Sequence, residues 1–267
     1  MGINGLRPVV EIQFADYIFP AYDQIVNEMA KVRHRSGGEF WCPVTIRTPA
    51  GGGIRGGHHH SQSPEAQFTH TPGLKVVYCS TPYNAKGLLI SAIEDNDPVI
   101  FFEPKRCYRG PFYGDPHNVP TWSGHPEAEV PESHYSIPLG EARVALEGDQ
   151  CTVISWGAMV HVCEQAIKDS GISCDLIDLQ TLVPWDREAV VKSIEKTGRC
   201  VIVHEAPKTS GFGAEMAASI QERCFWSLES PIERVTGWDT PFPHTTEWDY
   251  MPGPDRVAAA IAKTQEN

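Results

Sequence analysis

Short β-branched runs alternate with helical patterns along the first hundred residues. Residues 9–14 (VVEIQF) have the composition of a strand, and apolar side chains then recur at helical spacing between Tyr22 and Val32. Ser63, Pro64 and Glu65 form a helix start, with a hydroxyl cap, a proline at the first helical position and an acid facing the helix dipole. Further strands are predicted at 44–48, 74–79 and 99–104, and a further helix at 84–95. The alternation predicts a parallel sheet covered by helices.

The second half of the chain repeats this kind of pattern. Its strand-like runs are 151–157, 173–179, 200–205 and 232–238. Its helical patterns are 160–169, 186–195, 214–222 and 255–263. We therefore predict a second open α/β sheet.

A proline-rich stretch without sustained periodicity separates the two halves, and it is typical of a linker. The predicted fold is α/β, with two open parallel-sheet domains at residues 1–110 and 139–267 joined by a linker at 111–138. The first domain has room for only about four strands, fewer than such domains usually have. We expect it to be incomplete at its N-terminus.

Composition narrows the possible partners. The 267 residues carry 34 acidic and 22 basic side chains, a formal net charge of −12, without a basic cluster. Nucleic acid and anionic membranes are therefore not expected partners. The sequence has neither an apolar run long enough to span a bilayer nor a signal-peptide pattern, which predicts a cytosolic protein. The eight cysteines form no C-x-x-C pair, and we expect reduced thiols.

The densest unusual stretch joins a glycine-rich loop to three histidines. Residues 51–57 contain five glycines, and the loop lies between a strand end and a helix start, where open α/β sheets bind ligands. In an extended segment His58 and His60 would share one face. Three hypotheses remain for the histidines: a metal site, a proton-transfer or substrate contact, and a polar loop without chemistry.

Two other features are less specific. His204 and Glu205 end a predicted strand, where both a place at the sheet crest and a structural hydrogen bond are consistent with the sequence. The absence of a G-x-S-x-G elbow excludes the usual serine hydrolase arrangement.

Several long motifs resemble one enzyme family. They are EIQFADYIFPAYDQIVNEMAK at 11–31, HHHSQSPEA at 58–66, IEDNDPVIFF at 93–102 and HEAPKTSGFGAE at 204–215. Together they resemble the beta subunits of thiamine-diphosphate-dependent 2-oxo acid dehydrogenases, the decarboxylating first components of the 2-oxo acid dehydrogenase complexes. FADYIFPA, HSQSPEA and IFFEPK most resemble the branched-chain type.

The resemblance implies a pyrimidine-binding domain followed by a transketolase-type C-terminal domain, in an α2β2 heterotetramer that serves a lipoyl acyltransferase core. In that family thiamine diphosphate lies between subunits, and the alpha subunit holds its diphosphate and Mg²⁺. Carried over by motif, Tyr17 would pack against the aminopyrimidine with Gln13 beside it. His60 would line the channel by which the lipoyl group arrives and would give a proton to the developing thiolate.

The family also carries a structural potassium ion that is held largely by backbone oxygens. The matching positions in this sequence are Val44, Thr45, Ala92, Asp95 and Asp97. Asp97 stands where asparagine is often found and Ala92 where cysteine is found. Backbone ligands would make these two replacements unimportant.

One departure from the family bears on activity. Family members carry a glutamate, ahead of the segment that begins here, which hydrogen-bonds the pyrimidine ring nitrogen, and residues 1–7 offer no candidate for it. We expect a branched-chain 2-oxo acid dehydrogenase beta subunit, with a pyruvate or acetoin dehydrogenase subunit as the alternative. An assembly subunit without catalytic competence and a histidine-rich metal-binding protein are the remaining hypotheses.

Overall fold

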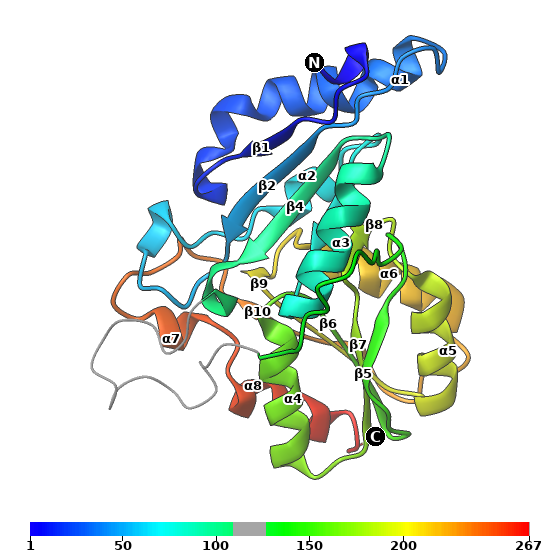
Figure 1. Ribbon diagram of the computed structural model, residues 1–267. Helices are drawn as coiled ribbons and strands as arrows, with labels where there is room; N and C mark the ends of the chain where they lie inside the picture. The colour runs from blue at the N-terminus through cyan, green and yellow to red at the C-terminus, as the bar shows by residue number, and fades with distance from the viewer. Residues whose placement is uncertain (109–126, 267) are drawn as a thin grey trace.

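The computed structural model describes residues 1–108 and 127–266, and it contains two five-stranded sheets (Figure 1). The first sheet has the order β1-β2-β4-β3-β8: β1 (Val9–Glu11), β2 (Thr45–Ala50), β4 (Val99–Pro104), β3 (Lys75–Tyr78) and β8 (Thr181–Val183). The second has the order β10-β9-β6-β7-β5: β10 (Glu233–Gly237), β9 (Cys200–Pro207), β6 (Cys151–Ser155), β7 (Cys174–Asp178) and β5 (Arg143–Leu146). β8 pairs antiparallel with β3, and β5 pairs antiparallel with β7, while the other pairs of strands in the described residues are parallel. Both sheets are therefore mostly parallel, as predicted.

Helices cover both sheets. They are α1 (Val32–Arg35), α2 (Glu65–Thr69), α3 (Pro82–Glu94), α4 (Met159–Ser170), α5 (Arg187–Thr197), α6 (Phe212–Cys224), α7 (Glu247–Tyr250) and α8 (Pro254–Lys263). Short 3₁₀ turns lie at Gly2–Asn4, Ala15–Tyr17, Phe19–Ala21, Met29–Lys31, Gly57–His59 and Lys105–Cys107. The helix expected between Tyr22 and Val32 is irregular, because Gln24–Glu28 is a π-helical stretch.

The alternation of side chains along β4 explains how the first sheet is covered. Ile100 and Phe102 point to the face that carries α2, where they join the largest apolar cluster. Val99 and Phe101 point to the opposite face, against Leu88 of α3. A strand with both faces buried reads as a continuous apolar run, which is why VIFFEP is visible in the sequence.

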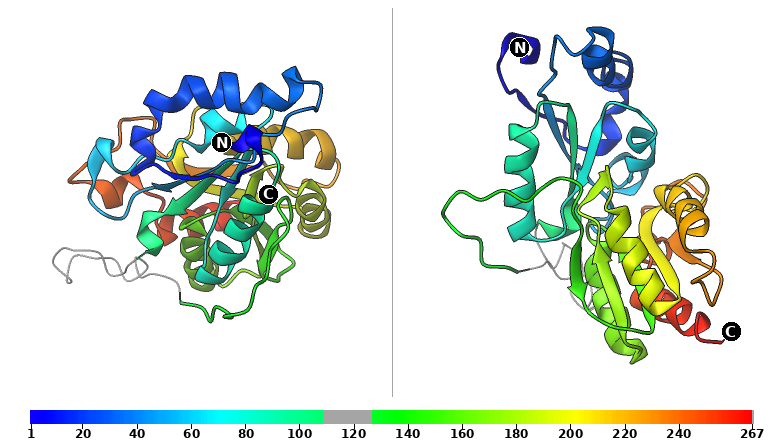
Figure 2. Two further views of the ribbon diagram at one scale, coloured as in Figure 1. Left: turned by 45° about the horizontal axis from the view of Figure 1, so that its top comes forward. Right: turned by 90° about the vertical axis from the view of Figure 1, so that its right-hand side faces the viewer.

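The same apolar cluster continues into the second half of the chain. It includes Ile154 of β6 and Ile202 of β9, which face α5 and α6, while α4 and α8 cover the opposite face of the second sheet. The two sheets lie one above the other in the right-hand view of Figure 2. The halves therefore share one core rather than meeting only through polar surfaces.

Strand β8 was not predicted. It comes from the second half of the sequence but pairs antiparallel with β3 of the first sheet, with Val183 opposite Val76. Three residues are too few to show a period, so the pattern of apolar residues did not reveal it. β5 and the short helix α7 were also missed.

The predicted start of helix α2 differs from the observed one. Ser63 does not cap α2: the helix begins at Glu65 after Pro64, and no side chain caps it.

Residues 109–126, most of the predicted linker, lie outside the described residues. Residues 127–138 run without helix or strand along α3, where the Ile137 amide donates to the Gly87 carbonyl at 3.2 Å. Within the described ranges, no helix has the length and apolar character that crossing a membrane requires.

The position of β8 generates a prediction about stability. Leu182 of β8 is fully buried in the shared cluster, so Leu182→Ala should lower the free energy of unfolding by about 2–5 kcal/mol. Val144→Ala on the half-exposed edge strand β5 is the matched control and should cost under about 1 kcal/mol. Denaturant unfolding followed by far-ultraviolet circular dichroism measures both. A loss at Leu182 no larger than that at Val144 would show that β8 is not part of the core.

Candidate functional site

Tyr17 and His60, 43 residues apart in the sequence, meet beyond the ends of two neighbouring strands. β1 and β2 are parallel, so the segments that follow them emerge at the same edge of the sheet. Tyr17 ends the turn Ala15–Tyr17, and His60 follows the turn Gly57–His59. The Tyr17 hydroxyl lies 3.3 Å from His60 Nε2, within hydrogen-bond distance.

Phe14 completes an aromatic site that motif matching did not identify. Its ring meets the His60 ring edge-on with centroids 4.9 Å apart, and the Tyr17 ring lies 5.7 Å from His60. Tyr17 remains 47% exposed and Gln13 is exposed, so the site opens to solvent on this side. The aromatic residue at the end of EIQF was the available sequence signal.

The other two histidines lie apart from this site. His58 and His59 are exposed, with their rings 4.0 Å apart, while His60 turns toward Tyr17. The expectation that His58 and His60 share a face is wrong, because residues 57–59 form a helical turn rather than an extended segment. Among the described residues, no group of three or more His, Cys, Asp or Glu side chains is arranged to hold a metal ion.

The glycine-rich loop packs against the second half of the chain. The Gly52 amide donates to Glu205 Oε2 at 2.8 Å, and the Arg55 amide donates to both carboxylate oxygens of Glu247 at 3.1 Å. Gly51 has a φ of +83°, and a Cβ there would lie 2.7 Å from Glu205 Oε2. The close backbone approach that the glycines permit is thus made to the protein's own carboxylates.

Burial perturbs the acids behind this loop. Glu65 is fully buried, and desolvation together with the charge of Glu205 raises its pKa to about 8. Desolvation also raises the pKa of Glu205, although the Gly52 amide and the cations Arg106 and Lys105 oppose this rise. Glu65 is therefore protonated at neutral pH.

His204, beside Glu205, has a structural environment. Its ring is fully buried and stacks on Trp156 with centroids 5.2 Å apart. Desolvation lowers its pKa to about 4, so the imidazole is neutral at physiological pH. Burial and stacking on Trp156 therefore hold His204, and neither ring nitrogen makes a hydrogen bond to a described residue, so the expected structural hydrogen bond of the imidazole is not observed.

The five predicted potassium positions gather at the corner between α3 and β4. The Thr45 hydroxyl donates to the Ala92 carbonyl at 3.0 Å, and the Val44 carbonyl accepts from the Val99 amide at 3.0 Å. The Asp95 carbonyl accepts a hydrogen bond from the Arg7 guanidinium at 2.6 Å. These oxygens already have donors from the protein.

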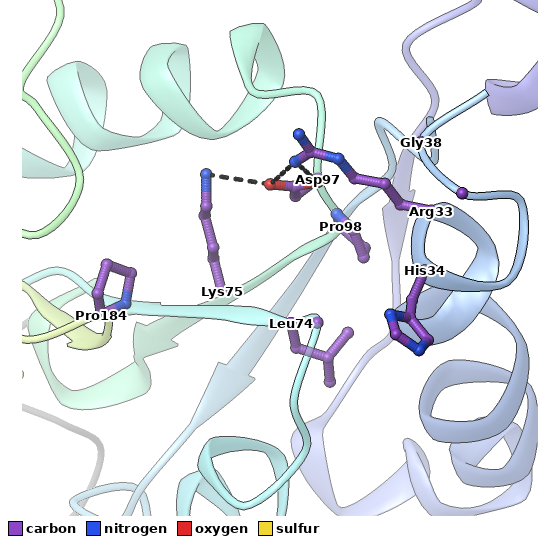
Figure 3. Close-up of a pocket in the computed structure, with 10 residues that line it drawn as sticks. Arg33, His34, Gly38, Leu74, Lys75, Asp97, Pro98 and Pro184 are labelled. Atoms are coloured by element: carbon purple, nitrogen blue, oxygen red, sulfur yellow. Dashed lines mark hydrogen bonds and ion pairs between the residues drawn. The ribbon is translucent and has the colours of Figure 1, made fainter. Parts of the chain in front are cut away.

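Both carboxylates at this corner are paired with basic side chains. Arg33 binds both oxygens of Asp97, at 2.9 and 3.0 Å, and Lys75 lies 2.5 Å from Asp95 and 3.6 Å from Asp97. Figure 3 shows Arg33 and Lys75 directed at Asp97 from two sides of a cavity of about 500 Å³. A second cavity, of about 1260 Å³, lies between α2 and α6. Neither of these two cavities is lined by Tyr17 or His60.

Both halves of the chain match known domain families. Residues 1–111 match the transketolase pyrimidine binding domain, and residues 140–257 match the transketolase C-terminal domain. Together these matches cover most of the chain.

Curated relatives are similar over the whole chain. The 2-oxoisovalerate dehydrogenase subunit beta of Pseudomonas aeruginosa is 56% identical, over 100% of this chain and 76% of that protein. The mitochondrial 2-oxoisovalerate dehydrogenase subunit beta of Dictyostelium discoideum is 55% identical over 99% of this chain and 69% of its own length. The pyruvate dehydrogenase E1 component subunit beta of Acholeplasma laidlawii is 44% identical over 98% and 77%.

Solved structures show the same fold at low identity. A split-gene transketolase, described as an inactive beta4 tetramer, superposes with a TM-score of 0.74 at 21% identity, over 98% of this chain and 76% of that one. A transketolase of Pichia stipitis in complex with sedoheptulose 7-phosphate superposes with a TM-score of 0.63 at 14% identity, over 97% of this chain and 34% of its own. At these identities the likeness supports the fold alone.

The buried acid predicts a pH-dependent stability. Glu65 has a pKa of about 8 in the folded state and an ordinary value near 4.5 when unfolded. Stability from this group is therefore complete below pH 4.5 and is lost as the pH rises through 8, by at most about 1.4 kcal/mol per pH unit. Glu65→Gln keeps the neutral form, so its advantage in melting temperature over wild type should be small at pH 5 and grow by several degrees toward pH 8. The exposed Glu215→Gln is the control, and parallel curves for Glu65→Gln and wild type would contradict the assignment.

Proposed function

The chain belongs to the family of 2-oxoisovalerate dehydrogenase beta subunits, and from this premise we propose that it serves oxidative decarboxylation of branched-chain 2-oxo acids. Its substrates would include 3-methyl-2-oxobutanoate, and the acyl group would pass to lipoyl-lysine on the acyltransferase core of the complex. The observation that supports this most directly is the meeting of Tyr17 and His60 at one sheet edge.

The aromatic site suits the aminopyrimidine of thiamine diphosphate. Tyr17 and Phe14 offer ring surfaces at the open edge of the sheet, and the exposed Gln13 amide can both donate and accept hydrogen bonds. Tyr17 would pack against the pyrimidine and Gln13 would lie beside it. When bound, the cofactor supplies the electron sink for decarboxylation, and this chain orients it.

The diphosphate end of the cofactor is assigned to an alpha subunit, together with Mg²⁺, in an α2β2 heterotetramer. The Lys105 ammonium lies 4.9 Å from the Phe14 ring centroid and is buried rather than presented to a ligand. Residues 1–110 and 139–267 would act as the pyrimidine-binding and C-terminal units. The cytosolic location remains a prediction, since the relatives from Dictyostelium and Arabidopsis are named mitochondrial.

His60 has the position for proton transfer to an arriving lipoyl group. Imidazole exchanges protons near neutral pH, and Nε2 lies at the exposed Tyr17 hydroxyl, which can hold the ring in one orientation. Opening the lipoyl disulfide produces a thiolate, which His60 would protonate.

The similarity to a pyruvate dehydrogenase subunit gives a second candidate substrate. Turnover of pyruvate, acetoin and 3-methyl-2-oxobutanoate by the chain assembled with its alpha subunit separates the candidates. A preference for pyruvate or acetoin would overturn the branched-chain assignment. Assembly without decarboxylation of any substrate would support the incompetent assembly subunit instead.

His60→Ala should separate two steps of the reaction. We expect reductive acylation of the lipoyl domain to fall by about 10²–10⁴-fold, because a positioned proton donor is lost, while decarboxylation with an artificial electron acceptor falls much less. His59→Ala is the matched control, because His59 is exposed and its ring packs against His58. Equal losses in the two assays would mean that His60 only shapes the site.

We also propose potassium at the corner between α3 and β4, in competition with Arg7. The candidate metal ligands are all oxygen atoms, which suits a hard cation such as potassium. To bind there, the ion would have to displace the Arg7 guanidinium from the Asp95 carbonyl. Arg7→Gln should therefore melt several degrees higher in potassium chloride than in choline chloride of equal ionic strength, while wild type changes little. Arg35→Gln, which loses only an exposed pair with Glu28, is the control. Equal melting temperatures of Arg7→Gln in the two salts would contradict the proposed potassium site.

A further inference from the structure

Lys105 is a buried cation whose function the proposed reaction does not explain. It directly follows β4 and is 3% exposed. Its Nζ makes no hydrogen bond to any described residue and lies 4.9 Å from the centroid of the Phe14 ring. The same Phe14 ring contacts His60. A buried ammonium is costly, so it calls for nearby negative charge.

Acids from three separate elements supply that charge. Asp16 from the turn after β1, Glu205 from β9 and Glu247 from α7 all raise the pKa of Lys105, and burial outweighs them and lowers it to about 8. Arg106 also lies near Glu205 and Glu247, and both raise its pKa. Asp16 raises the pKa of Lys105 but is not among the acids that raise the pKa of Arg106.

Each of these acids holds a backbone amide of the segment that carries His60. Glu205 accepts from Gly52, Glu247 accepts from Arg55, and Asp16 Oδ1 accepts from the Gln62 amide at 3.2 Å. The contacts lie on both sides of His60. Lys105 and Arg106 are therefore both buried countercharges for the carboxylates that fix residues 51–62, and Lys105 also faces Asp16.

We propose that Lys105 is a positioning residue for His60, acting through Asp16, Glu205 and Glu247 on the segment 51–62. This inference rests on the proposed function for its effect on turnover, but its effect on the segment does not. A charged ammonium attracts the three carboxylates electrostatically and so helps to hold them where they accept from the loop amides. Loss of the charge would loosen the segment and let the imidazole leave Tyr17.

Hydrogen exchange on the full chain tests the structural part. Lys105→Met removes the charge and keeps most of the volume, so the amides of residues 51–62 should exchange at least about tenfold faster, with β6 and β9 unchanged. Lys105→Arg keeps the charge and should restore slow exchange. Lys168→Met, on the exposed face of α4, is the control. Unchanged exchange at 51–62 in Lys105→Met, or equally fast exchange in Lys105→Arg, would overturn the proposal.

The pH profile of reductive acylation by the assembled enzyme tests the link to His60. The wild-type rate of reductive acylation should fall above about pH 8 as Lys105 loses its proton. In Lys105→Arg the rate should fall only at higher pH, because guanidinium stays charged. Lys105→Met should lower kcat below about pH 8 with little change in KM, and its difference from wild type should shrink at higher pH. An alkaline limb identical in wild type and Lys105→Arg would overturn the role of this charge. If the assembled enzyme transferred no acyl group, the proposed function would fail, while hydrogen exchange would still decide on Lys105.

Discussion

The Glu205 carboxylate, buried between the two halves of the chain, fixes the loop on which the functional site depends. It belongs to the interior strand β9 of the second sheet, yet its partner is the Gly52 amide after β2 of the first sheet, at 2.8 Å. A buried carboxylate needs donors, and a buried amide needs an acceptor, so neither half satisfies these groups alone. The glycines follow from this constraint, since a Cβ at Gly51 would collide with Glu205.

The shared core gives that hydrogen bond a fixed geometry. One apolar cluster runs from Phe102 in the first sheet to Ile202 in the second, and β8 crosses from one half to pair in the other. Well-packed interiors resist small displacements, so the ends of β2 and β9 keep a fixed position relative to each other. His60 lies on an irregular loop, but the loop is fixed at Gly52, Arg55 and Gln62. The site therefore has a precise geometry without regular secondary structure of its own.

The sequence predicted those parts of the fold in which a local pattern repeats. Strand β4 has the predicted bounds because its alternate residues are buried on both faces, and Tyr17 and His60 were identified through long motifs. β8 was missed because three residues carry no period. Phe14, Lys105 and Arg7 were missed because their roles depend on contacts between distant residues: Arg7 binds the Asp95 carbonyl 88 positions away. Charge pairing across a fold leaves no mark on local periodicity, whereas burial on two faces does.

The distribution of charge around the aromatic site explains why this chain should need a partner. Tyr17 is half exposed and Gln13 is exposed, so the site is open toward solvent. The nearby cations Lys105 and Arg106 are buried and are engaged with the acids that hold the loop. A diphosphate requires accessible positive charge or a metal ion, and cations already used as internal countercharges cannot supply it without releasing the loop. Under the proposed function, the described cations nearest this chain's aromatic site remain with the acids of the loop, which agrees with an alpha subunit binding the anionic end of the cofactor.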